Sequence, residues 1–131
     1  DRKNSDVKQF GPHEVKSTAS IRTIPLVGIS LQVFKAFPAG FPRYMDKTGT
    51  ASQTINSFLG ENGLLPTQEH TLYGLRHSFE DRMKVAKIDY EVRMDIFGHT
   101  VSRPKYGSGG GLAWQRDLLA NMALPFDRGI I

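Results

Sequence analysis

The sequence contains no cysteine in its 131 residues. A disulfide framework and a zinc site built on thiolates are therefore excluded, and nothing in the composition points to an oxidising compartment. Long apolar runs are missing too: no stretch of about 18 apolar residues is present to span a bilayer, and the polar start lacks the apolar core of a signal peptide. The composition predicts a soluble, cytoplasmic protein with no membrane partner.

An initiator methionine is also absent, so we expect the chain to derive from a longer one. The length fits one domain with a single modest core. Lys and Arg outnumber Asp and Glu by 17 to 13, and the resulting charge of +4 suits a polyanionic partner such as DNA. A charge of this size also occurs in ordinary globular proteins, so composition alone does not identify a nucleic-acid-binding protein.

The first part of the chain predicts a β-hairpin. Residues 1–12 are polar, as in a flexible segment or the remnant of an upstream region. Apolar residues then flank the small polar stretch Ser17–Ser20, so His13–Ser17 and Ser20–Val27 are expected to form two strands joined by a tight turn. Pro25 cannot donate to a ladder and fits an edge position or a strand end.

The rest of the chain predicts about five helices, because apolar residues recur at three- and four-residue steps between Gly and Pro residues. The expected helices run from an N-cap at Ser30 to Phe37, over Ser52–Leu59, over Leu72–Val85, from a cap at Asp89 to Gly98, and over Leu112–Met122. The predicted fold class is α+β with helices predominating, in which residues 13–124 form one domain and residues 125–131 a tail.

Three short strings in the C-terminal half hold residues suited to phosphate chemistry. The first, Leu72-Tyr-Gly-Leu-Arg-His-Ser-Phe, places Arg76 on a predicted helix. About twenty residues later Phe97-Gly-His ends in His99, and Tyr106-Gly-Ser-Gly follows shortly afterwards. In order and spacing these strings resemble the catalytic boxes of the tyrosine recombinases, the phage-integrase family. The resemblance implies that Arg76 and His99 contact a DNA phosphate and that Tyr106 is the nucleophile.

The resemblance extends upstream and has two departures. The string Lys16-Ser-Thr-Ala-Ser-Ile-Arg is similar to the hairpin that carries the family's catalytic lysine, which implies Lys16 as general acid. Tyr73 stands where the family most often has a histidine, and it either bonds the phosphate or packs half-buried. His77 is either an orienting residue or a helix-surface residue. The family's first catalytic arginine has no counterpart, so we expect the chain to begin downstream of it and of a separate DNA-clamping domain.

The chemistry that the resemblance implies is cleavage and rejoining of DNA strands. The Tyr106 phenol attacks a phosphodiester, forms a 3′-phosphotyrosyl intermediate and frees a 5′-hydroxyl, with no metal and no small-molecule cofactor. Arg76 suits the charge that builds on the nonbridging oxygens, because a guanidinium stays ionised and donates twice. His99 donates to the same phosphate, and Lys16 protonates the departing 5′ oxygen.

The expected partner is double-stranded DNA, on which a bacterial or phage-encoded protein of this kind assembles as a homo-oligomer during integration or excision. Since one phosphate donor is missing, the chain alone is expected to turn over weakly. Two alternatives stay open: a degenerate or truncated recombinase relic that binds DNA or a partner without cleavage, and a helical module of unrelated function with an accidental motif match.

Two further sets of residues have open roles. An apolar stripe is either core or an assembly surface: Trp114, Leu118, Leu119 and Met122. Five basic residues either touch the DNA backbone or are plain surface charges: Arg22, Arg82, Arg93, Arg103 and Lys105.

Overall fold

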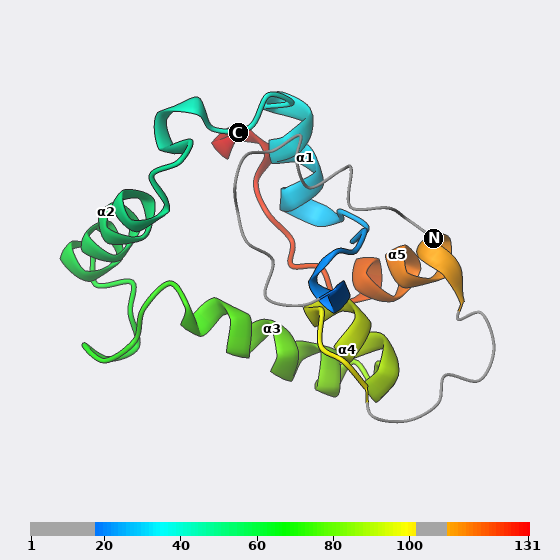
Figure 1. Cartoon of the computed structure of the whole chain (residues 1–131). Coiled ribbons are helices and arrows are strands. Elements are labelled where there is room, and N and C mark those ends of the chain that lie inside the picture. The colour runs from blue at the N-terminus through cyan, green and yellow to red at the C-terminus, as the bar shows by residue number, and fades with distance from the viewer. Residues whose placement is uncertain (1–17, 102–109) are drawn as a thin grey trace.

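The computed structural model describes residues 18–101 and 110–131. Most of this part of the chain is helical (Figure 1). The α-helices are α1 (Gly28–Ala36), α2 (Thr48–Glu61), α3 (Gly74–Val85), α4 (Tyr90–Phe97) and α5 (Gly111–Asn121). Short 3₁₀ turns are η2 (Thr18–Ser20), η3 (Pro42–Tyr44) and η4 (Arg128–Ile130). Across the described ranges, no helix combines the length and the apolar character needed to cross a lipid bilayer.

The predicted β-hairpin is wrong, and with it the α+β class. Residues 18–101 and 110–131 contain no strand: η2 replaces the start of the expected second strand, and residues 21–27 have no regular structure. The expected first strand, His13–Ser17, lies outside the described residues. The physical reason is that residues 21–27 lie against helices, whose backbone groups are already paired internally and offer no edge for a ladder. The segment is held by side chains instead, with Val27 packed on the core and Arg22 bonded to the end of α4.

The five predicted helices are present in the predicted order, and their ends follow local signals to different degrees. Asp89 caps α4 and Gly98 ends it, as predicted. The N-cap predicted at Ser30 is wrong, because α1 begins at Gly28 and Val27 is its N-cap residue. Ser30 lies inside the first turn, where its hydroxyl donates back to the carbonyl of Val27 at 2.6 Å.

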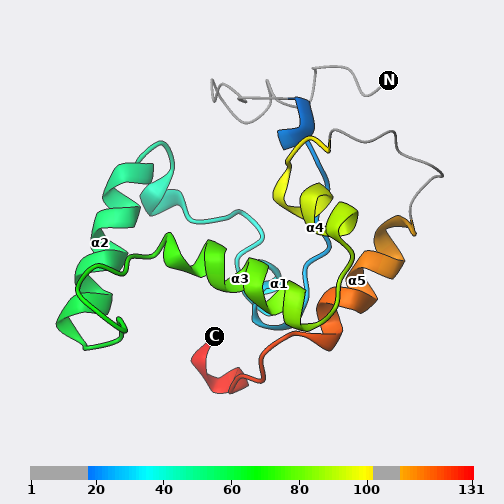
Figure 2. The ribbon, with the colours of Figure 1, turned by 90° about the horizontal axis from the view of Figure 1, so that it is seen from below.

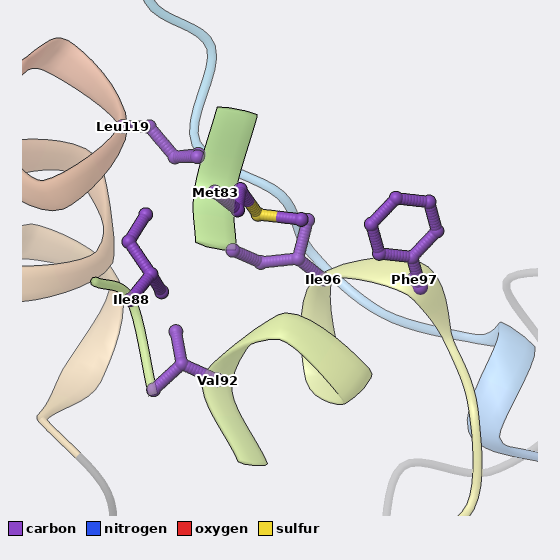
Figure 3. Packing of buried hydrophobic residues seen from close by; sticks show 6 residues of the cluster. All are labelled: Met83, Ile88, Val92, Ile96, Phe97 and Leu119. Carbon is purple, nitrogen blue, oxygen red and sulfur yellow. The ribbon is translucent and has the colours of Figure 1, made fainter. Parts of the chain in front are cut away.

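A small apolar core lies where α3, α4 and α5 meet (Figure 3). Its buried members are Met83, Ile88, Val92, Ile96, Phe97 and Leu119. Partly buried side chains pack against it: Val27, Phe79, Leu118 and Met122. Most of the predicted stripe on α5 therefore belongs to the core, whereas Trp114 is 43% exposed. Because the buried side chains of this cluster come from α3, α4, α5 and the turn between α3 and α4, these helices form the part of the chain that burial holds together.

Helices α1 and α2 contribute no buried residue. In both views α2 lies to one side of the other helices (Figures 1 and 2). The backbone N–H of Leu72 donates to Asn56 Oδ1 at 2.6 Å, which ties α2 to the chain just before α3. Between α1 and η3, the ring of Phe41 contacts Phe34 and Phe37 at centroid distances of 6.3 and 5.8 Å, yet all three remain about half exposed.

Removal of the cap at Asp89 is expected to loosen α4. Asp89 Oδ1 accepts the backbone N–H of Glu91 at 2.8 Å, and loss of such a cap costs about 1 kcal/mol. Asp89→Ala should therefore lower the free energy of unfolding by about that amount in urea denaturation. Asp89→Asn keeps the side-chain acceptor and should stay within a few tenths of the unmodified chain. Equal losses in the two variants would show that the cap is not the source of the effect.

Candidate active site

Two of the residues singled out in the sequence, Arg76 and His99, lie side by side. Arg76 belongs to the first turn of α3, and His99 follows the end of α4. Arg76 Nη2 is 3.3 Å from His99 Nε2, although 23 positions separate the two residues in the chain. A guanidinium has only donors, so in this contact His99 Nε2 is the acceptor. Arg76 is partly buried and His99 is exposed, which leaves the pair accessible from solvent.

The end of α4 fixes the position of the His99 backbone. Gly98 adopts the left-handed conformation, with φ 70° and ψ 33°. The backbone N–H of His99 donates to the carbonyl of Met94 at 2.9 Å, and that of Gly98 donates to Asp95 at 3.2 Å. This pair of bonds is a Schellman motif, which glycine favours because it lacks a Cβ. The helix end predicted from Gly98 therefore also sets the direction in which His99 leaves the helix.

The remaining two carbonyls at the end of α4 are capped by arginine side chains. Arg22 Nε donates to the carbonyl of Ile96 at 2.8 Å, and Arg76 Nη2 donates to that of Phe97 at 3.4 Å. The last four carbonyls of a helix have no partners within the helix, and the negative end of the helix dipole attracts cations. Together with the Schellman bonds, the two arginines satisfy all four.

The ring of Phe97 supports both members of the Arg76–His99 pair. Arg76 Cζ lies 4.4 Å from the ring centroid, a cation–π distance. The imidazole of His99 stacks on Phe97 with centroids 6.1 Å apart and an interplanar angle of 11°. Phe97 is only 7% exposed, so its ring is held by the core. Phe97 was named from the sequence only as part of the string Phe97-Gly-His and was given no role, although an aromatic directly before Gly-His was a signal for this one.

A cleft of about 590 Å³ opens beside His99. One wall is the segment around Arg22, another is the end of α4 with the residues after it, and the third is α5. Its lining residues are Ala19, Ile21, Arg22, Thr23, Asp95, His99, Thr100, Val101, Leu112 and Gln115. A volume of this size is within the range of small-molecule binding sites, so the cleft can admit a phosphate with parts of its sugar or base.

The other predicted site residues divide into two groups. Tyr73 and His77 contact each other edge to face at the start of α3, with centroids 5.4 Å apart. Tyr73 is 65% exposed, so it does not pack half-buried, and its contact with a phosphate stays a prediction. Lys16 and Tyr106 lie outside the described residues, and their roles stay predictions.

Three arginines that were expected to be DNA contacts or plain surface charges have specific partners in the protein. Arg22 caps α4, Arg82 Nη2 donates to the carbonyl of Met122, and Arg93 Nη1 lies 3.8 Å from Glu80 Oε1. These roles could not be predicted from the sequence, because no local pattern shows which distant carbonyl or carboxylate an arginine side chain contacts. Arg103 and Lys105 lie outside the described residues.

At the far end of α3 from Arg76, Lys84 pairs with carboxylates. Its Nζ lies 3.3 Å from Glu80 Oε1 and 3.3 Å from Asp81 Oδ1. Hydrogen bonds to Glu80 and Asp81 raise the pKa of Lys84 above its ordinary value. Within the described ranges, no three acidic or histidine side chains gather in a way that could hold a metal ion. This charged cluster belongs to the surface of α3 and not to the cleft.

No protein-family model, curated protein or solved structure matches the chain. The assignment of a function therefore depends on the residues and on their geometry.

Proposed function

We propose that this chain is the C-terminal catalytic part of a tyrosine-type site-specific DNA recombinase. It would cut and rejoin DNA strands through a 3′-phosphotyrosyl intermediate during integration or excision. The observation that carries the proposal is the contact between Arg76 Nη2 and His99 Nε2 at 3.3 Å. Two separate sequence motifs point to these two residues, and the proposed reaction requires both side chains to contact the same phosphate.

The contact between Arg76 and His99 describes the site without an anion. Arg76 does not itself line the cleft, but its Nη2 contacts His99, which does. A phosphate oxygen that enters the cleft beside His99 can take over the N–H groups of Arg76, which are ionised and need no proton transfer to donate. His99 can donate from Nε2 only after that nitrogen gains a proton, by uptake from solvent or by exchange of tautomer. The pair therefore opens as the phosphate binds, and both side chains then face the charge that builds on its nonbridging oxygens.

Lys16 and Tyr106 complete the proposed reaction. Lys16 stands three positions before Ala19, and Tyr106 five positions after Val101; both Ala19 and Val101 line the cleft. In the proposal, Tyr106 Oη gives its proton to solvent water and forms a bond to phosphorus as the bond to the 5′ oxygen breaks, and Lys16 donates a proton to that oxygen. Rejoining reverses these steps, and the phosphotyrosyl bond conserves the energy needed. No metal and no small-molecule cofactor takes part in the proposed steps.

The proposed partner is double-stranded DNA in the cytoplasm, with the protein assembled on it as a homo-oligomer. The net charge of +4 favours such a polyanion. Tyr73 and His77 are the candidates for additional contacts to the bound strand, since both are exposed at the start of the helix that holds Arg76.

Trapping of the covalent intermediate tests the proposal. A longer protein that carries the upstream region would be incubated with a pool of random duplexes, each nicked so that the strand released after cleavage diffuses away. We expect a protein–DNA adduct that withstands denaturing electrophoresis, and we expect Tyr106→Phe to abolish it because the nucleophilic oxygen is gone. Tyr90→Phe removes the hydroxyl of an exposed tyrosine on α4 and should leave the adduct yield unchanged. No adduct from any duplex, or an adduct that persists in Tyr106→Phe, would contradict the proposal.

A second candidate is a relic that binds DNA without cleaving it. It is favoured by the contacts of Arg76 inside the protein, with the carbonyl of Phe97, the ring of Phe97 and His99, because an arginine so engaged can serve as a helix cap alone. The same experiment separates the two: binding that weakens with rising salt in the absence of any adduct indicates the relic.

A further inference from the structure

Arg22 joins two segments that are 74 positions apart. Its Nε donates to the carbonyl of Ile96 at 2.8 Å, and its Nη1 donates to the carbonyl of Ser20 at 2.9 Å. The N–H groups of a guanidinium point in fixed directions within one plane, so the two bonds fix the position of one carbonyl relative to the other. Arg22 therefore holds the segment after η2 against the last turn of α4.

The guanidinium of Arg22 lies directly on Gly98. A Cβ at position 98 would be 2.6 Å from Arg22 Nη1 and 3.1 Å from the carbonyl oxygen of Ala19. Glycine at this position therefore serves two purposes: it adopts the positive φ of the Schellman motif and leaves space for Arg22. His99 is the next residue, so any shift of this turn moves the imidazole.

We propose that Arg22 is a positioning residue that holds His99 beside Arg76. The Schellman bonds fix the turn from within α4, Arg22 fixes it from the segment opposite, and the imidazole then stacks on Phe97 and reaches Arg76. The inference rests on the proposed function only for the role that it gives to His99. The contacts themselves do not depend on what the cleft binds.

Two of the five N–H donors of Arg22 are engaged in the protein and not by a phosphate. Arg22 and His99 both line the cleft, but Nε and Nη1 of Arg22 already donate to backbone carbonyls. A phosphate contact through Nε and Nη1 would break the hydrogen bonds to the carbonyls of Ile96 and Ser20. Arg22 is not a member of the buried core cluster, although the backbone carbonyl that it bonds belongs to Ile96, whose side chain is.

Amide hydrogen exchange on the 131-residue chain tests the inference without any need for activity. Arg22→Gln should raise the exchange rates of the Gly98 and His99 amides about tenfold, because the charged donor to Ile96 is lost. The amide of Ile88, which donates to Met83 in the core, should keep its rate. Arg22→Lys restores one charged donor without the planar fork and should give an intermediate rate. Arg116→Gln is the matched control, since Arg116 is exposed and bonds its neighbour Asp117.

Three results would overturn the inference. Unchanged rates at Gly98 and His99 would show that Arg22 does not hold the turn. An equal rise at Ile88 would show that Arg22 supports the whole fold and not this turn. In the longer protein, a shallower salt dependence of DNA binding in Arg22→Gln would show that Arg22 contacts a phosphate. The expected result there is slower adduct formation with an unchanged salt dependence. Absence of any adduct from the unmodified protein would count against the recombinase function, and the exchange rates would still decide the role of Arg22.

Discussion

Replacement of Arg76 by lysine is expected to slow formation of the phosphotyrosyl adduct by about 10²–10³-fold. The guanidinium of Arg76 lies 4.4 Å from the ring centroid of Phe97, and its Nη2 reaches both the carbonyl of Phe97 and the imidazole of His99. A lysine ammonium has no planar fork and cannot stack on the ring while donating twice to a phosphate. The rate is best measured in a single turnover on a nicked duplex at saturating protein, so that a change in DNA affinity does not enter.

Arg43 supplies the matched control for Arg76→Lys, because it is an exposed arginine whose Cζ lies 5.5 Å from the ring centroid of Tyr44. Arg43→Lys should leave the rate unchanged. A second comparison places Arg76→Lys in a His99→Gln background, where the loss should be smaller because the proposed mechanism places both residues on one phosphate. Wild-type rates in Arg76→Lys, or full additivity of the two substitutions, would contradict a shared site.

Replacement of Met83 by alanine is expected to produce the largest loss of stability. Met83 is the one side chain with no exposed surface among the described core residues. Truncation of a buried methionine costs about 2–5 kcal/mol, against total stabilities of about 5–15 kcal/mol for a domain. Urea denaturation followed by circular dichroism should therefore show a much lower midpoint at an unchanged slope.

Met45→Ala is the control for Met83→Ala, since the same side chain is removed at a position that is 61% exposed. Its effect should stay within about 0.5 kcal/mol. If both substitutions destabilised the chain equally, the core would not lie between α3, α4 and α5. Under conditions where Met83→Ala remains folded, its adduct rate should match that of the unmodified protein, which separates folding from catalysis.

Secondary structure was predictable from the sequence where its signals are local. Asp89 and Gly98 mark the two ends of α4 because a cap and a left-handed turn depend on a few neighbouring residues. The hairpin failed because strand pairing is not local. The apolar residues of Ser20–Val27 fit a half-buried strand, and they fit equally a segment that lies across helices and is held by Arg22 and Val27.

The candidate site was predictable in its residue types but not in its supports. Arg76 and His99 were both predicted from the sequence strings around them. Their contact could not be predicted, because it forms only when α3 packs beside the end of α4. The roles of Phe97 and Arg22 depend on the same tertiary arrangement, because a ring supports its neighbours and an arginine caps a carbonyl only once the helices are packed. Lys16 and Tyr106 stay predictions.

The uneven burial along the chain has a consequence for the order in which it melts. Regions with few buried contacts open at lower free energy than the core, and α2 has no buried residue while α3, α4 and α5 share the core cluster. Helix α1 likewise has no buried residue, so partial unfolding would release α1 and α2 first and leave the contact between Arg76 and His99 intact. Arg76 and His99 therefore belong to the cooperative unit that unfolds last, and heating should lower the helical circular-dichroism signal before it breaks their contact.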